Sequence, residues 1–241
     1  MNVRARILAL LGIPAAVSDR WDGVRLTAQV AAENEVLIYG PIVPGLDATF
    51  FTEFLGDALV VSNNIFRDRL NAISGDVTVR INSPGGDVWE ASGMMTALTE
   101  RRNAGDAVNV IVDGLAASAA SLVMLAAGDI RVAPLASIMI HQTSGLMHGT
   151  AQEFRDMAEF LDRMDRQAAA LYAARMQMTE DAVLDALKEE RWYTGPEAVE
   201  AGLADGVIEL ENRSPDNPEP QAAQMFARRN MRLAALARAA T

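Results

Sequence analysis

A run of small residues, GLAASAAS at 114–121, places two hydroxyls between the apolar segments VNVIVD and LVMLAAG. Small neighbours let a substrate backbone approach closely, and a helix beginning here would present free N–H groups and a partial positive charge. The run therefore indicates either close packing or a nucleophilic serine. Ser118, at the expected helix start, is the candidate nucleophile, and the hydroxyl of Ser121 is expected to bond to a backbone carbonyl.

A serine hydroxyl is a weak nucleophile and needs a base, and the chain has 2 histidines. His141 follows the apolar segment SIMI, so a rigid strand end would hold its imidazole. His148 lies in SGLMHGT, a flexible loop, and is expected to be exposed. His141 is therefore the candidate base, and the alternative is a core histidine bonded to the backbone.

The turn PGG at 84–86 precedes a helical segment and is interpreted in two ways. It could be a simple helix-start turn, or its backbone N–H groups could stabilise an oxyanion together with the N–H of Ala119, the residue after the candidate nucleophile. Trp89 and Trp192 are expected to be packing residues. No phosphate-binding loop motif occurs and no residues have metal-ligand spacing, so neither a cofactor nor a metal is expected.

Alternating apolar patterns predict the elements that would position these groups. β-Branched and apolar runs predict strands, and helical spacing of apolar residues predicts helices. Strand–helix alternation is typical of an α/β fold built from parallel βαβ units, whose sites gather at the carboxyl ends of the strands. We therefore expect the loops after three strands to meet at one crevice. The predicted strands are 35–43, 76–83, 108–114, 129–134, 136–142 and 204–210, and the predicted helices are 49–73, 84–103, 116–128, 150–178, 179–188 and 196–202.

Composition narrows the class of protein. Of 241 residues, 50% are hydrophobic and 22% are charged, as in a soluble globular protein. The net charge of −11 disfavours nucleic-acid binding but not a peptide substrate. The count of 0 cysteines excludes a disulfide scaffold, a cysteine zinc site and a cysteine nucleophile. No apolar run reaches the roughly 18–20 residues that span a bilayer, so no membrane contact is expected.

The chain divides into three regions by pattern. Residues 1–31 carry ILALLGIPAA after two arginines, which we interpret as a cytoplasmic arm rather than an export signal. Residues 32–210 form the predicted domain. Residues 211–241 begin as a polar, proline-rich linker and end as a basic, helix-prone tail, either a frayed helix or a docking or processing segment.

The motifs INSPGGD, GLAASAAS, IMIHQ and RWYTGPEAVEAGLAD occur in this order across residues 32–210. This series resembles the Clp-type serine peptidases, the ClpP family. Within that family the chain is most similar to the phage-associated branch of prohead or head-maturation proteases, because MIHQ runs quickly into the helical segment EFRDMAEFLDRMD.

The resemblance assigns roles residue by residue. It implies that Ser118 is the nucleophile, that His141 is the general base, and that the backbone N–H groups of Gly86 and Ala119 bind the oxyanion. The family's third triad member is usually an aspartate six residues before the proline of the PEA motif.

That position is Glu190 here, which departs from the family pattern. Glutamate is one methylene longer and could still orient the imidazole. Glu189 and Asp185 are neighbouring alternatives.

The resemblance also implies an architecture and a substrate. The expected fold is a ClpP/crotonase-like spiral of βαβ units, in which residues 150–178 form a long handle helix. Homo-oligomeric rings, single or stacked, would act on polypeptides, with phage capsid or scaffold protein as the expected substrate in the host cytoplasm or assembling prohead. The alternatives are a general peptidase working with an ATP-driven unfoldase, a crotonase-type acyl-CoA enzyme and an inactive ring scaffold.

Overall fold

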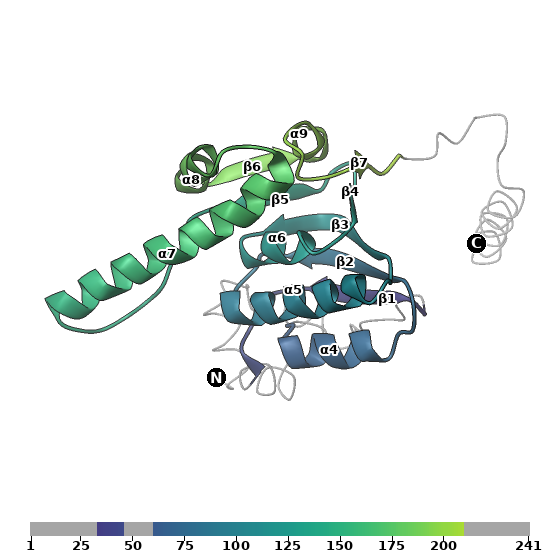
Figure 1. Cartoon of the computed structure of the whole chain (residues 1–241), viewed down its shortest axis with the longest axis horizontal. Coiled ribbons are helices and arrows are strands. Elements are labelled where there is room, and N and C mark those ends of the chain that lie inside the picture. The colour runs from purple at the N-terminus through teal and green to yellow at the C-terminus, as the bar shows by residue number, and fades with distance from the viewer. Residues whose placement is uncertain (1–32, 46–59, 210–241) are drawn as a thin grey trace, which may run out of the picture. The chain divides into compact units, whose positions relative to one another are not determined.

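A computed structural model describes residues 33–45 and 60–209, which form one mixed sheet flanked by helices (Figure 1). The main path of the sheet runs β1-β2-β3-β4-β7, while β5 pairs with β3 and β6 pairs with β5. Every pair is parallel except β5–β6. The strands are β1 Glu35–Tyr39, β2 Val77–Ser83, β3 Val108–Ala117, β4 Asp129–Val132, β5 Ser137–Ile140, β6 Arg191–Thr194 and β7 Gly206–Val207.

The central strands owe their position to a two-residue alternation of buried and half-exposed side chains. Val77, Val79 and Ile81 of β2 are fully buried, and the residues between them are half exposed or exposed. Val110 of β3 pairs in register with Val79, so the buried side chains of both strands lie on the same face. β-Branched side chains suit such a pleated, half-buried surface.

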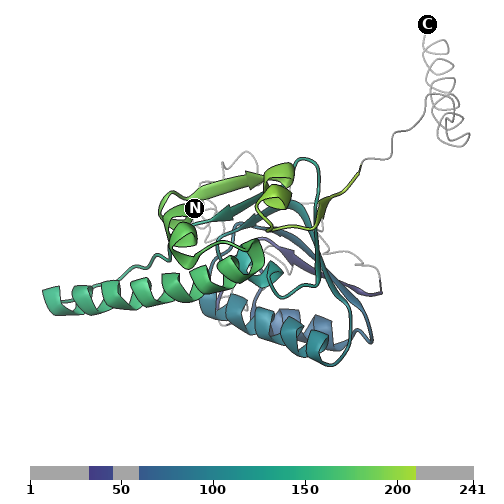
Figure 2. The ribbon, with the colours of Figure 1, turned by 45° about the horizontal axis from the view of Figure 1, so that its top comes forward.

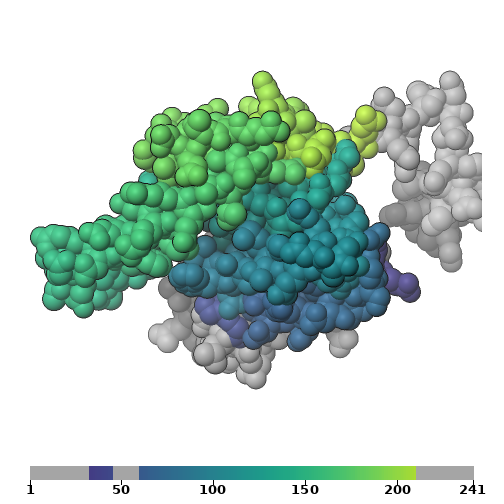
Figure 3. All heavy atoms as spheres, viewed as in Figure 1, coloured from purple at the N-terminus to yellow at the C-terminus, as the bar shows by residue number. Residues whose placement is uncertain are grey.

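Three helices cover that face, and a fourth extends away from the body. α4, α5 and α6 lie along one side of the sheet, and the first half of α7 projects from the rest of the domain (Figures 1 and 2). The space-filling view shows the same projection at the left of the molecule (Figure 3). The helices are α4 Asn63–Asn71, α5 Val88–Asn103, α6 Ala119–Met124, α7 Ala151–Met176, α8 Glu180–Lys188 and α9 Gly195–Glu200.

Side-chain caps set where the site-forming helices begin. The carboxylate of Asp87 accepts the N–H groups of Trp89 and Glu90 at 2.9 Å, which fixes the start of α5 beside the PGG turn. Thr150 and Glu153 form a capping box at the start of α7. These caps place both helix starts at loops that follow strands β2 and β5.

The parallel α/β architecture confirms the fold class predicted from the sequence, with three local differences. RWYT forms β6, antiparallel to β5, where only parallel units were expected. β3 continues to Ala117, so α6 begins at Ala119 and not at 116. Trp89 and Trp192 are 62% and 53% exposed, so the expectation that they are packing residues is wrong.

Several expectations fall outside the described residues. These are the arm at 1–31, the first part of the helix at 49–73, and the linker and tail at 211–241. Within the described ranges, none of the helices combines the length and apolar character needed to cross a bilayer.

Candidate active site

Ser118 occupies a sharp turn between β3 and α6. Its backbone has φ 54° and ψ −127°, a conformation that an L-residue adopts only under strain of about 1–3 kcal/mol. Its N–H donates to the carbonyl of Met139 on β5 at 2.9 Å, which ties the turn to the neighbouring strand. A strained turn between a strand and a helix exposes the side chain at its tip.

The PGG turn packs directly on this strained turn. A Cβ atom at Gly85 would lie 2.5 Å from the carbonyl oxygen of Ala117 and 2.9 Å from the Cβ of Ser118. Only glycine therefore fits at this approach, since both contacts are shorter than ordinary Cβ contacts. The close packing suggested by the small residues is present, and it serves to bring two loops together.

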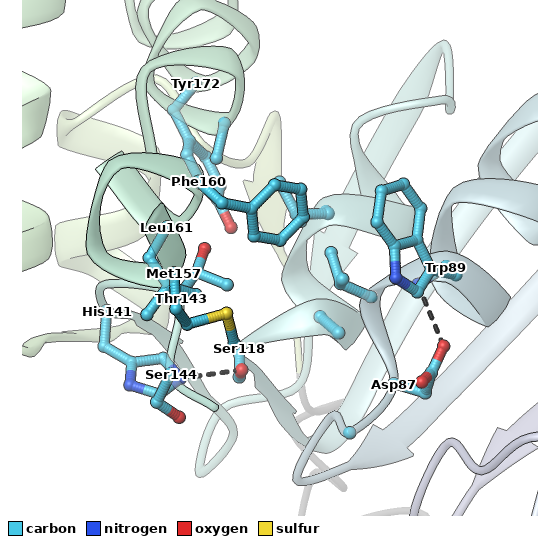
Figure 4. A pocket seen from close by; sticks show the side chains of 15 residues that line it. Asp87, Trp89, Ser118, His141, Thr143, Ser144, Met157, Phe160, Leu161 and Tyr172 are labelled. Atoms are coloured by element: carbon cyan, nitrogen blue, oxygen red, sulfur yellow. Dashed lines mark hydrogen bonds between the residues drawn. The ribbon is translucent and has the colours of Figure 1, made fainter. Parts of the chain in front are cut away.

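His141 lies immediately after β5 and faces Ser118. Its Nε2 atom is 2.7 Å from the Oγ atom of Ser118, as the dashed line in Figure 4 marks. The two residues meet because β5 pairs in parallel with the end of β3, so both strands end at the same edge of the sheet. His148 is exposed, as predicted.

Two backbone N–H groups remain available next to Ser118. In the described part of the chain, the N–H groups of Gly86 and Ala119 donate to no other protein group. Ile42 pairs with the residues on either side of Gly86, accepting from Asp87 N–H at 2.9 Å and donating to Gly85 O at 2.8 Å. This bridge holds Gly86 in a backbone conformation with φ 140° that favours glycine.

These groups open into a cavity of about 260 Å³ that Gly86, Ser118, Ala119 and His141 line together. The apolar part of its lining comes from α5, α6 and α7. Figure 4 labels four of these side chains, Trp89, Met157, Phe160 and Leu161. The Trp89 and Phe160 rings face each other across part of this lining, with centroids 6.2 Å apart. The apolar lining residues are Val88, Trp89, Leu122, Met157, Phe160, Leu161 and Ala168.

A model of the Clp protease family matches residues 60–211, which is more than half of the chain. The chain belongs to the Clp protease family. Among solved structures it is similar to the ClpP1 N165D mutant from Listeria monocytogenes, with 26% identity, coverage of 75% of this chain and 94% of that chain, and a TM-score of 0.58. Clp proteases are peptidases that act on polypeptides as oligomeric rings, and the sheet and helices described above match their fold.

The carboxylates considered for a triad in this Clp protease all lie away from the imidazole. The side chain of Glu190 accepts from Trp192 Nε1 at 3.3 Å, Glu189 lies 3.8 Å from Arg191, and Asp185 pairs with Lys188 at 2.9 Å.

All three carboxylates are exposed. Within the described ranges, His141 forms no hydrogen bond to a carboxylate. In the same ranges, no group of three or more potential metal ligands is assembled.

Glu190 immediately precedes β6, the strand that pairs with β5. β5 and β6 pair antiparallel, and the register ends with Ile140 opposite Arg191, so His141 and Glu190 are the next residues along the two segments. Glu190 has φ 51°, a left-handed conformation, at the turn between α8 and β6.

Two polar side chains of α7 bond to the segments that carry His141 and Ser118. The sequence pattern alone did not identify them. Asp165 is buried and bonds to the segment after His141. Tyr172 is buried and bonds to Ser121, whose hydroxyl donates to Ser118 O as predicted. Burial raises the pKa of Tyr172, so its hydroxyl stays protonated. A charged residue inside an apolar helical stripe was the signal that could have revealed Asp165.

Proposed function

We propose that this Clp protease is a serine endopeptidase in which Ser118 is the nucleophile and His141 the general base. The observation that carries the proposal is the 2.7 Å contact between Ser118 Oγ and His141 Nε2 at the edge of the cavity. That separation lies within the range needed for direct proton transfer. The strained backbone at Ser118 supports the same role, since strain persists where the surrounding structure holds a residue for function.

The proposed reaction is acyl transfer. With its own proton on Nδ1, His141 takes the hydroxyl proton at Nε2 while Ser118 Oγ bonds to the scissile carbonyl carbon. The carbonyl π electrons move to oxygen, and the free N–H groups of Gly86 and Ala119 stabilise that charge. His141 then protonates the leaving amine as the C–N bond breaks, which leaves an ester on Ser118. In the second half, His141 takes a proton from water as the water attacks the ester carbonyl. It then returns the proton to Ser118 Oγ as the acyl group leaves as a carboxylic acid.

We assign the third triad position to Glu190. The support is that the pairing of β5 with β6 ends at Ile140 and Arg191, the neighbours of His141 and Glu190. On this proposal the Glu190 side chain rotates away from Trp192 and brings its carboxylate toward Nδ1. Glu189 and Asp185 are the alternatives, but both have cationic partners. Glu189, the C-cap of α8, lies near Arg191, and Asp185, within α8, pairs with Lys188. A carboxylate at this place would fix the tautomer and stabilise the imidazolium.

The substrate proposed is a polypeptide of an assembling phage head, either capsid or scaffold protein. The support is the sequence resemblance of the segment after MIHQ to the phage-associated branch of the family. On this proposal the enzyme works without hydrolysing ATP itself, as a ring of identical subunits in the host cytoplasm or the prohead. Residues 32–210 would form the peptidase domain, with an arm at 1–31 and a linker and basic tail at 211–241.

Labelling with a fluorophosphonate, followed by intact mass and peptide mapping, tests the assignment. The expected result is one adduct on Ser118, lost in Ser118→Ala and strongly slowed in His141→Ala. Ser144→Ala is the matched control, because Ser144 lines the same cavity and should not alter labelling. Labelling that persists in Ser118→Ala would contradict the proposal.

The other candidate functions predict different results. A crotonase-type enzyme would bind acyl-CoA in a calorimeter and resist the phosphonate. An inactive scaffold would form rings, which particle sizing would detect, but would not hydrolyse peptides. The phage role is tested by intact mass of co-expressed capsid and scaffold proteins, which should be cut by the wild type and not by Ser118→Ala.

A further inference from the structure

Helix α7 directs two buried polar side chains toward the two loops that carry the proposed nucleophile and base. Asp165 and Tyr172 are seven residues apart, so they lie on the same face of the helix. Ala169 lies between them on this face and is fully buried. Two polar groups on the buried, mainly apolar face of a helix cost free energy unless each of them is hydrogen-bonded.

Asp165 holds the segment that follows the base. One carboxylate oxygen accepts the N–H of Thr143 at 2.6 Å, and the other accepts Gln142 Nε2 at 3.1 Å. Asp165 is 4% exposed, and its carboxylate forms no salt bridge within the described ranges. A buried anion bonded to backbone fixes that backbone strongly, because losing the bond would leave the charge unsatisfied. The segment that it fixes begins one residue after His141.

Tyr172 holds the turn that carries the nucleophile. Its hydroxyl lies 2.6 Å from Ser121 Oγ, and Ser121 Oγ donates to the carbonyl of Ser118 at 2.6 Å. Since the single proton of Ser121 is used in that second bond, Tyr172 donates to Ser121. The chain of two hydrogen bonds therefore ends on the strained residue itself.

We infer that Asp165 and Tyr172 are positioning residues, which together set the distance between Ser118 Oγ and His141 Nε2 from one rigid helix. The inference rests on the proposed function, because it assumes that these two atoms react. Neither residue touches the reacting atoms, so both act through the backbone that they hold. Both loops are therefore hydrogen-bonded to helix α7. Neither loop can shift alone without breaking a buried hydrogen bond.

Asp165→Ala and Asp165→Asn separate positioning from a direct electrostatic role. Loss of the acceptor in the alanine variant should lower kcat by on the order of 10–100-fold through misplacement of the base. KM should stay within about threefold, because the substrate-facing wall is intact. Asparagine keeps an acceptor oxygen for Thr143, so it should restore activity to within about fivefold of wild type. Asp162→Asn, an exposed aspartate on the same helix, is the matched control and should behave as wild type.

Tyr172→Phe removes one hydroxyl and should lower kcat by on the order of tenfold. Tyr193→Phe, at another buried tyrosine, is its control and should leave kcat unchanged. Adding Ser121→Ala to Tyr172→Phe should cost little beyond Ser121→Ala alone, since both residues belong to one hydrogen-bond chain.

Rates of phosphonate labelling are measured on the same variants per folded protein, with folding followed by circular dichroism. If Asp165→Asn is as slow as Asp165→Ala, the negative charge itself is required and the positioning role of Asp165 is refuted. If Tyr172→Phe labels at the wild-type rate, the role of Tyr172 is refuted, and this variant remains informative if Asp165→Ala does not fold. If the wild type does not label at Ser118, the proposed function fails instead.

Discussion

Replacement of Ser118 by glycine is expected to stabilise the fold relative to replacement by alanine. The residue has φ 54° and ψ −127°, and an alanine there keeps a strain of about 1–3 kcal/mol that glycine relieves. Glycine also makes the unfolded chain more flexible, which costs about 0.5–1 kcal/mol. With the middle of each range, the net gain for Ser118→Gly over Ser118→Ala is about 1 kcal/mol.

For a domain of this size that difference corresponds to about 2–4 °C in Tm. Both variants lack the hydroxyl, so the comparison isolates the backbone from the chemistry. Thermal and urea unfolding followed by far-ultraviolet circular dichroism measure it. Ala120→Gly, two residues further on in α6, is the control with the opposite sign, because glycine inside a helix costs about 0.5–1 kcal/mol. A Ser118→Ala variant that is as stable as Ser118→Gly would refute the reasoning that the turn is strained.

Three further predictions concern Gly86, Glu190 and the helix cap at Glu197. Gly86→Ala would place a Cβ atom 2.0 Å from Ile42 O, so the N–H at 86 must move, and peptide-hydrolysis assays should show kcat lowered by about 100-fold or more. Glu190→Gln should lower kcat by about 10²–10⁴-fold, whereas Glu189→Gln should stay near wild type; equal effects in both variants would remove the assignment of the acid. Hydrogen bonds from the N–H and the hydroxyl of Thr194, the N-cap of α9, hold the pKa of the Glu197 carboxylate below its ordinary value. The stability that these bonds contribute is fully present above the ordinary carboxylate pKa of about 4. It is lost as the pH falls through the lower pKa that Glu197 has in the folded protein. The Tm of the wild type should therefore fall more steeply than that of Glu197→Gln between about pH 5 and pH 3.

The sequence predicted the parallel sheet because apolar alternation records which side chains are buried. The strands at Val77–Ser83 and Val108–Ala117 carry this pattern along most of their length. The same reasoning located the crevice, since parallel strands end at a common edge. Gly86, Ser118 and His141, placed after three different strands, line one cavity.

Some features could not be predicted from local pattern. RWYT is short and mostly exposed, so its pairing with β5 depends on a neighbour that only the folded chain supplies. The small, apolar residues from Ala116 onward predict a helix over 116–128, yet β3 continues to Ala117 because the neighbouring strand β5 pairs with Leu115 through Ala117.

Helix α7 gave the largest difference between pattern and packing. Phe154 and Leu171 belong to the apolar stripe of this helix, and such a stripe normally faces a core, but these side chains are 52% and 41% exposed. The helix buries Asp165 and Tyr172 instead, and both are satisfied by hydrogen bonds to other elements. A polar residue can occupy a core position when a distant loop supplies its partner, and a helical periodicity contains no information about that loop.

The most direct test of the central claim is a crystal structure of the protein after reaction with a peptidyl phosphonate. We expect a covalent bond from phosphorus to the Oγ of Ser118, with His141 Nε2 still within hydrogen-bond distance of the adduct. One phosphonyl oxygen should lie about 2.7–3.1 Å from the N–H groups of both Gly86 and Ala119. An adduct on another residue, or an oxygen pointing away from both N–H groups, would contradict the account.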